Sequence, residues 1–300
     1  MKVAIGRRSF MTIAALGLLG PRVGQARASA EPRLVAIDWA AADTLLALGI
    51  VPLAVSDVET YRQWLPGSAP KEMLDLGSRA EPNMELIASL KPDAILISNW
   101  QGNLAEQLQR VAPTLAVTII APGADPLQNS QTELFRLAKL HGREEQATAY
   151  LASFNAGLSR RAAEISAIGM PPVFVGVLHE NGSQLFLYGE GSWVHSLLRR
   201  MGLRNALSRP TSAFGNALVD LAELAASPDA ILLHLDQGDR TRRAARLLGR
   251  STLWRNLPMV RAGNVCPIAP FYPLGGMLSV ERAVGVIADA VLDIDRRRHG

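Results

Sequence analysis

Cysteine is almost missing from this 300-residue chain. The single thiol, Cys266, has no partner for an intramolecular disulfide and belongs to no zinc-type cluster of cysteines. After residue 30, no stretch approaches the roughly 18 apolar residues of a membrane-spanning helix. We therefore expect packing alone, rather than disulfides or bound metal, to stabilise the fold.

Catalytic motifs are also missing. The sequence contains no G-x-x-x-x-G-K-S/T phosphate loop, no G-x-G-x-x-G, no H-E-x-x-H and no G-x-S-x-G. These absences fit a binding protein, which needs neither a nucleophile nor a general base. An exported α/β enzyme with catalytic side chains outside these motifs is the alternative from another functional class.

Histidines are few and widely spaced. None of the five forms a paired ligand motif. Three of them, His179, His195 and His234, lie in the second half of the chain, so a site that binds zinc or manganese directly requires that they converge in the fold. We expect no metal bound by the protein itself and no cofactor.

Positive charge is concentrated at the N-terminus. The chain has 31 Lys and Arg against 27 Asp and Glu, and five of the basic residues, with no acidic one, lie within residues 1–30. Without these five, 26 basic side chains face 27 acidic ones. This balance argues against nucleic-acid binding, which draws most of its affinity from the neutralisation of phosphates.

Residues 1–30 have the pattern of a cleavable export signal. Two adjacent arginines, Arg7 and Arg8, precede a short apolar run, and Ala28-Ser29-Ala30 supplies small residues for cleavage. The arginine pair is typical of twin-arginine export. We therefore expect a mature chain that begins at Glu31 and lies in the periplasm.

Short apolar runs alternate with helical patterns along the rest of the chain. Strands are predicted at 34–37, 51–55 and 94–98, and helices at 43–48 and 84–90. This alternation is typical of an α/β fold with mostly parallel sheets.

Two segments of the first half are echoed in the second. Lys91-Pro92-Asp93 with its following apolar run is matched by 227–232, and the order Trp, Leu-Leu, Gly over 39–49 is matched by 193–202. Proline ends the helix and prepares the bend into the strand in each case. We therefore predict two related α/β lobes.

A long helix is predicted between the two lobes. Residues 144–168 contain no proline and keep apolar side chains at approximate helical spacing. As one helix they would be about 37 Å long. We expect this rigid connector to join an N-terminal lobe over 31–143 to a C-terminal lobe over 169–300. A stiff connector permits less closure than a pair of hinge loops.

The few aromatic residues gather in loops and at strand ends, where α/β folds place ligand sites. Trp64 follows the second predicted strand, Trp100 follows the third, and Phe214 lies in a polar loop. Phe271 and Tyr272 stand between two prolines. For each of these residues, the alternative is a place in the core of a lobe.

Arg79 lies in a loop before the predicted helix at 84–90. Its guanidinium is suited to fork onto anionic oxygens of a ligand. Pairing with Glu81 or Glu85 on the protein surface is the other interpretation, and the residues alone leave both open.

Six segments carry a family resemblance. They are 36–39, 45–57, 61–64, the Gly-Ser-Arg-Ala-Glu-Pro-Asn motif within 76–86, the stretch over 252–263 and the Phe271-Tyr272 loop. In these segments, and over nearly all of 33–290, the chain resembles the periplasmic ferric hydroxamate siderophore-binding proteins. Those proteins belong to the helical-backbone class of ABC-transporter solute-binding proteins.

The resemblance implies two α/β lobes joined by one long helix, with a ferric siderophore as ligand in a shallow cleft between them. The siderophore would hold the iron, so no catalytic residue, metal ligand or cofactor is implied. Trp100 stands where the family has a tyrosine, and Pro270 stands where it has a tryptophan. The ligand-binding residues predicted on this basis are Arg79, Trp64, Trp100, Phe214, Tyr272, Phe271, Ser212 and Trp39.

The resemblance also implies docking to an inner-membrane ABC permease through one glutamate on each lobe. Glu106 matches the glutamate of the first lobe, and Glu223 is the nearest acid to that of the second. We expect a monomer that delivers a siderophore of the ferrichrome, ferrioxamine or coprogen type. A protein of the same fold that binds another large chelate, such as cobalamin or haem, is the alternative.

Overall fold

The strands of the first half of the chain form one parallel sheet. The structure, a computed structural model, describes residues 31–65, 67 and 69–299, so the expected export signal lies outside the described residues. The sheet has the order β3-β2-β1-β4-β5, which reverses between β1 and β4. Ligands of doubly wound folds bind at such a reversal. The strands are β1 (Leu34–Ala36), β2 (Ala54–Val55), β3 (Leu74–Asp75), β4 (Ala94–Ser98) and β5 (Thr114–Val117).

The helices that accompany this sheet complete the first lobe. The helix predicted over 43–48 begins earlier, at Trp39, because the Asp38 carboxylate caps it by accepting the N–H of Ala40 over 2.8 Å. The strand predicted over 51–55 is reduced to β2, since Pro52 has no N–H to donate. The helical elements are α1 (Trp39–Ala47), α2 (Val58–Trp64), α3 (Met84–Leu90), the 3-10 helix η1 (Asn99–Leu104), α4 (Ala105–Gln109) and α5 (Pro126–His141).

A second sheet forms the second lobe. It has the order β10-β9-β6-β7-β8, in which β10, β9 and β6 are parallel while β7 and β8 are antiparallel to their neighbours. The two sheets together are mostly parallel, which confirms the predicted fold class. The elements are β6 (Val173–Leu178), β7 (Gln184–Tyr188), α7 (Trp193–Arg200), β8 (Asn216–Asp220), α8 (Leu221–Leu224), β9 (Ile231–Leu235), α9 (Asp239–Arg250), α10 (Thr252–Asn256), α11 (Pro258–Arg261) and β10 (Val265–Ile268).

The sequence echo corresponds to equivalent helices in the two lobes. Helices α1 and α7 each begin with a fully buried tryptophan, Trp39 and Trp193. Each is followed by a glycine in the left-handed region, Gly49 at φ +73° and Gly202 at φ +76°. A side chain would be strained at either position, so glycine ends both helices in the same way.

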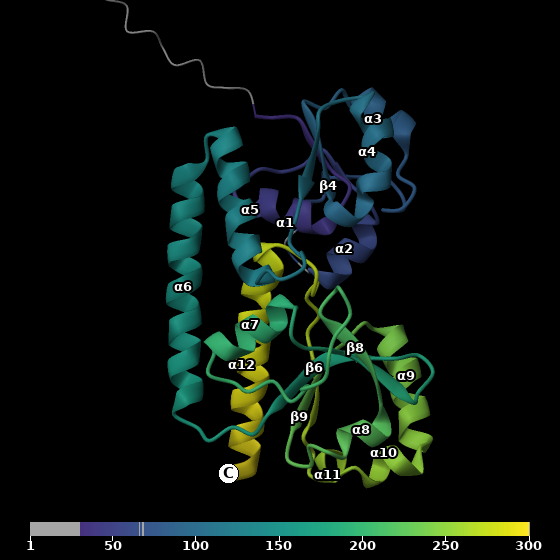
Figure 1. The fold of residues 1–300 in the computed structure, drawn as a ribbon, viewed down its shortest axis with the longest axis vertical. Helices are drawn as coiled ribbons and strands as arrows, with labels where there is room; N and C mark the ends of the chain where they lie inside the picture. Colours follow the sequence, from purple (N-terminus) through teal and green to yellow (C-terminus); the bar gives the residue numbers. More distant parts are fainter. Residues whose placement is uncertain (1–30, 66, 68, 300) are drawn as a thin grey trace, which may run out of the picture. The chain divides into compact units, whose positions relative to one another are not determined.

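The connecting helix predicted over 144–168 is present, and a second long helix, which was not predicted from the sequence, runs beside it along the molecule (Figure 1). They are α6 (Glu144–Ser166) and α12 (Met277–His299). The Tyr150 hydroxyl on α6 donates to the Glu281 carboxylate on α12 over 2.7 Å. None of the helices in the described part of the chain combines the length and apolar character that a membrane span requires.

One hydrophobic core joins both sheets. The largest cluster of buried side chains includes Leu96 from the first sheet, Leu233 from the second, Leu158 from α6 and Ile287 from α12. Interiors of this kind are close-packed. Because separating the lobes would break this packing, the fold resists wide opening.

A buried carboxylate ties α1 to the start of α12. Asp43 is fully buried. It accepts hydrogen bonds from the hydroxyls of Tyr61 (2.6 Å) and Ser279 (2.5 Å) and from the N–H of Gly276 (3.1 Å). Burial raises the pKa of Asp43 to about 7, although these donors favour the charged form. The turn before α12 is therefore anchored to the first lobe.

The close approach of α12 to α1 requires glycine at position 276. A Cβ there would lie 2.7 Å from Thr44 Oγ1 and 2.9 Å from the backbone oxygen of Ala40. We predict that Gly276→Ala lowers the free energy of unfolding by about 1–3 kcal/mol, measured by urea denaturation. Gly285→Ala, within α12, is the control because a Cβ there meets open space. Equal losses in the two variants would contradict this account.

Candidate functional site: a cleft between the lobes

Two connected cavities lie where the lobes meet. The smaller, of about 200 Å³, is lined from both lobes, with Asp38 and Trp100 from the first and Phe214 and Tyr272 from the second. The larger, of about 380 Å³, shares Trp100, Phe214 and Tyr272 and adds Arg79. The candidate site is thus assembled from segments far apart in the sequence.

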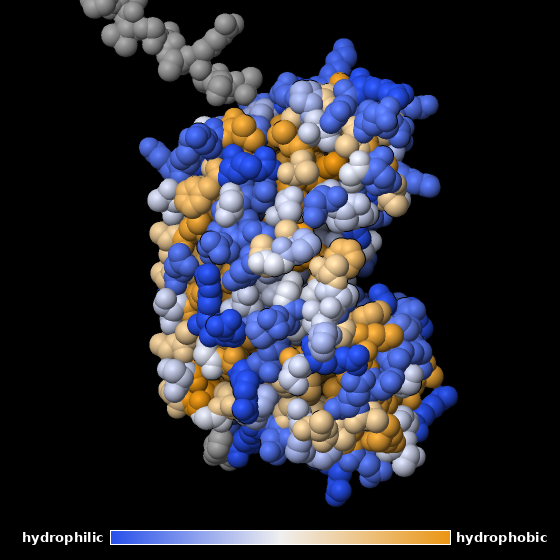
Figure 2. All heavy atoms as spheres, viewed as in Figure 1, coloured by the Kyte–Doolittle hydropathy of each residue, from blue (hydrophilic) through white to orange (hydrophobic). Residues whose placement is uncertain are grey.

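A third cavity, of about 530 Å³, extends the cleft along α2. Trp64 lines it from the first lobe, and Gln237 and Pro270 line it from the second. The rings of Trp64 and Tyr272 are 6.1 Å apart, so this cavity adjoins the other two. Figure 2 shows the surface hollowed between α2 and α9.

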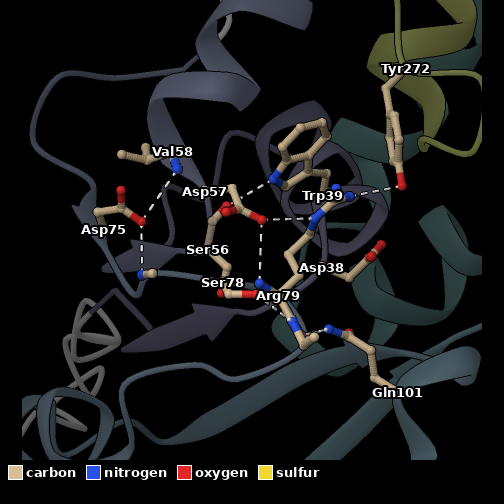
Figure 3. Close-up of polar contacts among 12 residues, drawn as sticks. Asp38, Trp39, Ser56, Asp57, Val58, Asp75, Ser78, Arg79, Gln101 and Tyr272 are labelled. Atoms are coloured by element: carbon tan, nitrogen blue, oxygen red, sulfur yellow. Dashed lines mark hydrogen bonds and ion pairs between the residues drawn. The ribbon is translucent and has the colours of Figure 1, made fainter. Parts of the chain in front are cut away.

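Arg79 holds the centre of the cleft (Figure 3). Its Nε donates to the Asp57 carboxylate over 3.2 Å, and its NH1 donates to the Tyr272 hydroxyl over 2.9 Å. The Gln101 amide donates to its backbone oxygen over 2.7 Å. Within the described part of the chain, the NH2 group makes no hydrogen bond. The guanidinium is therefore oriented by the protein while its NH2 donors remain available to a ligand.

Trp39 packs its ring against the guanidinium of Arg79. The guanidinium carbon lies 3.8 Å from the centre of the Trp39 ring, a cation–π contact. The indole N–H donates to the Ser56 carbonyl over 2.8 Å, which fixes the ring. Trp39 is only 1% exposed. The expectation that Trp39 contacts the ligand is therefore corrected: its burial leaves it the part of orienting Arg79.

Asp57 reaches Arg79 through an unusual backbone conformation. It lies in the left-handed region at φ 50° and ψ 44°, which Asp tolerates better than most residues. Its carboxylate accepts both the backbone N–H of Arg79, over 3.3 Å, and the side-chain Nε. Strain of this kind gathers at functional sites.

Tyr272 links the two lobes. It follows β10, and its ring packs edge-on against Trp39 with 4.9 Å between centres. Burial raises the pKa of Tyr272, and the nearby Asp38 raises it further. The hydroxyl therefore keeps its proton and can donate to a ligand while it accepts from Arg79.

A buried carboxylate closes the floor of the smallest cavity. Asp38 is 1% exposed, and its Oδ2 accepts the indole N–H of Trp100 over 3.3 Å. Burial raises the pKa of Asp38, while the N–H of Ala40, the charge of Arg79 and the Trp100 bond each lower it. The resulting carboxyl group lies between an aromatic wall and a cation.

Four of the predicted aromatic residues line the cleft, namely Trp64, Trp100, Phe214 and Tyr272, whereas Trp39 and Phe271 are buried. Trp100 and Phe214 are 45% and 44% exposed, and Trp64 is half-buried. Phe271 is fully buried against Trp193, with 5.5 Å between ring centres. The expectation for Phe271 is therefore corrected: because Tyr272 faces the cleft, the preceding ring faces the core.

Ser212 orders the loop that carries Phe214. It is exposed, its hydroxyl donates to Asn216 Oδ1 over 2.9 Å, and it accepts the N–H of Phe214 over 3.1 Å. These bonds hold the Phe214 loop at the mouth of the cleft.

The three histidines of the second half do not meet. His179 follows β6, His195 is on α7 and His234 is on β9. Among the residues that the structure describes, no group of three or more His, Cys, Asp or Glu side chains is placed to hold a metal ion. The direct metal site therefore lacks the convergence that it required.

Both predicted docking glutamates lie on the surface. Glu106 on α4 pairs with Arg110 over 2.8 Å, and its side chain is 87% exposed. Glu223 on α8 pairs with Arg209 over 2.6 Å, and its other oxygen accepts the N–H of Asp220 over 3.2 Å. Glu223 thus also caps its own helix.

Sequence reasoning missed Asp38 and Asp57. Each comes two residues after a strand of the first sheet, Asp38 after β1 and Asp57 after β2. Since the carboxyl ends of parallel strands share one edge of a sheet, this repeated spacing was the available signal.

Comparisons with known proteins agree with this fold. The model of the periplasmic binding protein family matches residues 34–270. The chain is 31% identical to the iron(3+)-hydroxamate-binding protein FhuD of Escherichia coli K12, over 96% of this chain and 97% of that protein. It is 26% identical to the vitamin B12-binding protein of Salmonella typhimurium, over 60% of this chain and 64% of that protein.

A solved structure is similar over most of the chain. It is the siderophore-binding protein FhuD from Vibrio cholerae with Fe3+-Desferal bound, at 29% identity and a TM-score of 0.82. The match covers 89% of this chain and 100% of that one. The similarity therefore extends over both sheets and the long helices that join them.

Proposed function

The chain belongs to the periplasmic binding protein family, and we propose that it captures ferric hydroxamate siderophores in the cleft around Arg79 and delivers them to an ABC permease of the inner membrane for iron uptake. The relatives to which it is similar are substrate-binding transport proteins rather than enzymes. Relatives that bind iron hydroxamate or carry Fe3+-Desferal support this ligand class.

The observation that carries the proposal is the pair of donors on Arg79 and Tyr272. Hydroxamate oxygens keep partial negative charge when they chelate iron(III), and they accept hydrogen bonds. The NH2 group of Arg79 and the hydroxyl of Tyr272 lie together at the centre of the cleft. Hydrogen bonds from a charged donor are stronger than neutral ones, so Arg79 gives the ligand its direction.

The aromatic walls suit the organic shell of such a ligand. Trp64, Trp100 and Phe214 offer large apolar surface with few rotatable bonds, which limits the entropy lost on binding. The siderophore supplies all the oxygens around the iron, which is cargo. The protein therefore needs to recognise only the outside of the chelate.

Cobalamin is the second candidate ligand. The similarity to a vitamin B12-binding protein favours it, and aromatic walls would accept its bulk. Arg79 has less to bind in cobalamin than in a hydroxamate. Haem would favour an axial histidine or tyrosine. Among the described residues that line the three cavities there is no histidine, and the hydroxyl of Tyr272 is already bonded to Arg79, so haem fits less well.

Export and docking complete the proposal. The signal pattern of residues 1–30 supports twin-arginine export to the periplasm, where the mature chain, from Glu31, acts as a monomer. Glu106 and Glu223, one on each lobe, face solvent and are available to basic residues of the permease. On this basis the docking surface lies on α4 and α8.

A fluorescence titration tests the ligand class. Mature protein from Glu31 is titrated with ferrichrome, ferrioxamine and coprogen, and with cobalamin, haem, ferric salt and zinc salt as controls. We predict saturable quenching of tryptophan emission by an iron-loaded hydroxamate at concentrations well below those of the controls. A tryptophan protein that binds none of them corrects for light absorbed by the chromophores. Flat hydroxamate curves beside a response to cobalamin or haem would refute the proposed ligand.

Replacement of Arg79 tests the central contact. We predict that Arg79→Ala weakens ferrichrome binding by about 10- to 100-fold, because a charged hydrogen bond contributes about 1.5–3 kcal/mol. Arg79→Lys keeps the positive charge but lacks the planar set of guanidinium donors, so the loss of ferrichrome affinity should be smaller than in Arg79→Ala. Both are measured by isothermal titration, with thermal denaturation as the check on folding. Unchanged affinity in folded Arg79→Ala protein would remove Arg79 from the site.

Replacement of the docking glutamates separates binding from delivery. We predict that Glu106→Gln and Glu223→Gln leave ferrichrome affinity unchanged and reduce uptake by cells that depend on this protein. Gln at position 223 retains an acceptor for the helix cap, so the fold is preserved. Glu85→Gln, an exposed acid on α3, is the control. Full uptake by the Glu106 and Glu223 variants would contradict this docking surface.

A further inference from the structure

The smallest cavity of the cleft contains an acid that the proposed function does not use. Of the described residues that line this cavity of about 200 Å³, Asp38 alone is charged. Its other walls are mainly apolar or aromatic, with Trp100, Phe214 and Tyr272 the largest side chains. Pockets for drug-sized molecules are about 300–1,000 Å³, so this one suits a substituent rather than a whole chelate.

The carboxylate of Asp38 retains accepting capacity. Its Oδ1 accepts the backbone N–H of Ala40, and its Oδ2 accepts the indole N–H of Trp100 at 3.3 Å, the long end of the hydrogen-bonding range. The backbone of Trp39 is a third hydrogen-bond partner of this carboxylate. An ionised carboxylate offers about four acceptor positions. A donor on a ligand in this cavity would therefore find an unsaturated acceptor.

The charges around Arg79 do not cancel. Its guanidinium is bonded to Asp57 and lies close enough to Asp38 to influence its ionisation. The single positive charge of Arg79 thus lies beside two carboxyl groups, those of Asp57 and Asp38, so the acidic groups outnumber the basic one. In the adjoining cavity, Asp236 and Arg240 offset each other. By formal count, the lining of the three cavities therefore has one more acidic than basic side chain despite its central arginine.

A carboxyl group surrounded by aromatic rings, as Asp38 is in this cavity, is an environment that favours binding of an organic cation. The faces of Trp, Tyr and Phe attract cations through their quadrupoles, and a carboxylate adds charge and hydrogen-bond acceptance. We propose that the cavity above Asp38 is a subsite for an ammonium group at the end of a siderophore, so that the protein prefers cationic ferric hydroxamates over otherwise identical neutral ones. This inference rests on the proposed function.

The test uses two ligands with the same iron chelate that differ at one end of the chain, where one carries a positive charge and the other is neutral; the dependence on salt separates the charge from the added bulk. Ferrioxamine B ends in a primary ammonium, and its N-acetylated derivative presents the same iron chelate without it. We expect the protein to bind ferrioxamine B about three- to tenfold more tightly at low ionic strength, and the ratio to fall as salt is added. Both affinities are measured by isothermal titration with the mature chain.

Asp38→Asn tests the source of the preference. Asn caps helices as well as Asp, so α1 keeps its start. We expect the ratio of affinities to fall close to one in this variant. Glu85→Gln removes one negative charge from an exposed position on α3 and should leave the ratio unchanged.

Trp100→Phe separates charge from positioning. It removes the indole N–H that bonds Asp38 but keeps an aromatic wall and the carboxylate, so the preference should persist. Equal affinities for the two ligands in the natural protein, or a full preference in Asp38→Asn, would overturn the subsite and leave the proposed function standing. Failure to bind either ligand would refute the proposed function itself, and the subsite with it.

Discussion

The geometry of the cleft depends on the buried carboxylate of Asp43. Helix α1 packs Trp39 against the guanidinium of Arg79 and, one turn later, places Asp43 at the start of α12. The turn that Asp43 anchors is the one that follows Tyr272, since the N–H of Gly275 donates to the Tyr272 carbonyl over 2.8 Å. A single helix of the first lobe therefore sets where the second lobe places its tyrosine, and so where Arg79 finds its partner.

This construction favours a site that is formed before the ligand arrives. Arg79 is held by Asp57, Trp39 and Tyr272 from three directions. The long helices and the shared core oppose wide movement of the lobes. Affinity then comes from contacts already in place rather than from closure, because a preorganised site loses less entropy on binding.

The sequence predicted the layers and the aromatic residues better than it predicted their orientation. Alternating strands and helices and the connecting helix follow from local patterns. The place of Arg79 in the cleft was implied only by the family resemblance, because the residues alone left a surface ion pair equally open. The burial of Phe271 and Trp39 does not, because adjacent loop residues face opposite sides only once the fold is assembled. Helix α12 was missed although its apolar residues, from Met277 to Ile294, recur with helical spacing. Asp38 and Asp57 share one spacing after their strands, but this spacing does not indicate that Arg79, the cation that gives them their role, lies beside them.

A crystal structure of the mature protein with ferrichrome would test the central claim most directly. The account predicts hydroxamate oxygens within hydrogen-bonding distance, about 2.7–3.2 Å, of the Arg79 NH2 group and the Tyr272 hydroxyl. It also predicts that the six ligands of the iron all belong to the siderophore. A chelate bound away from Arg79, or a protein side chain in the coordination shell of the iron, would contradict it.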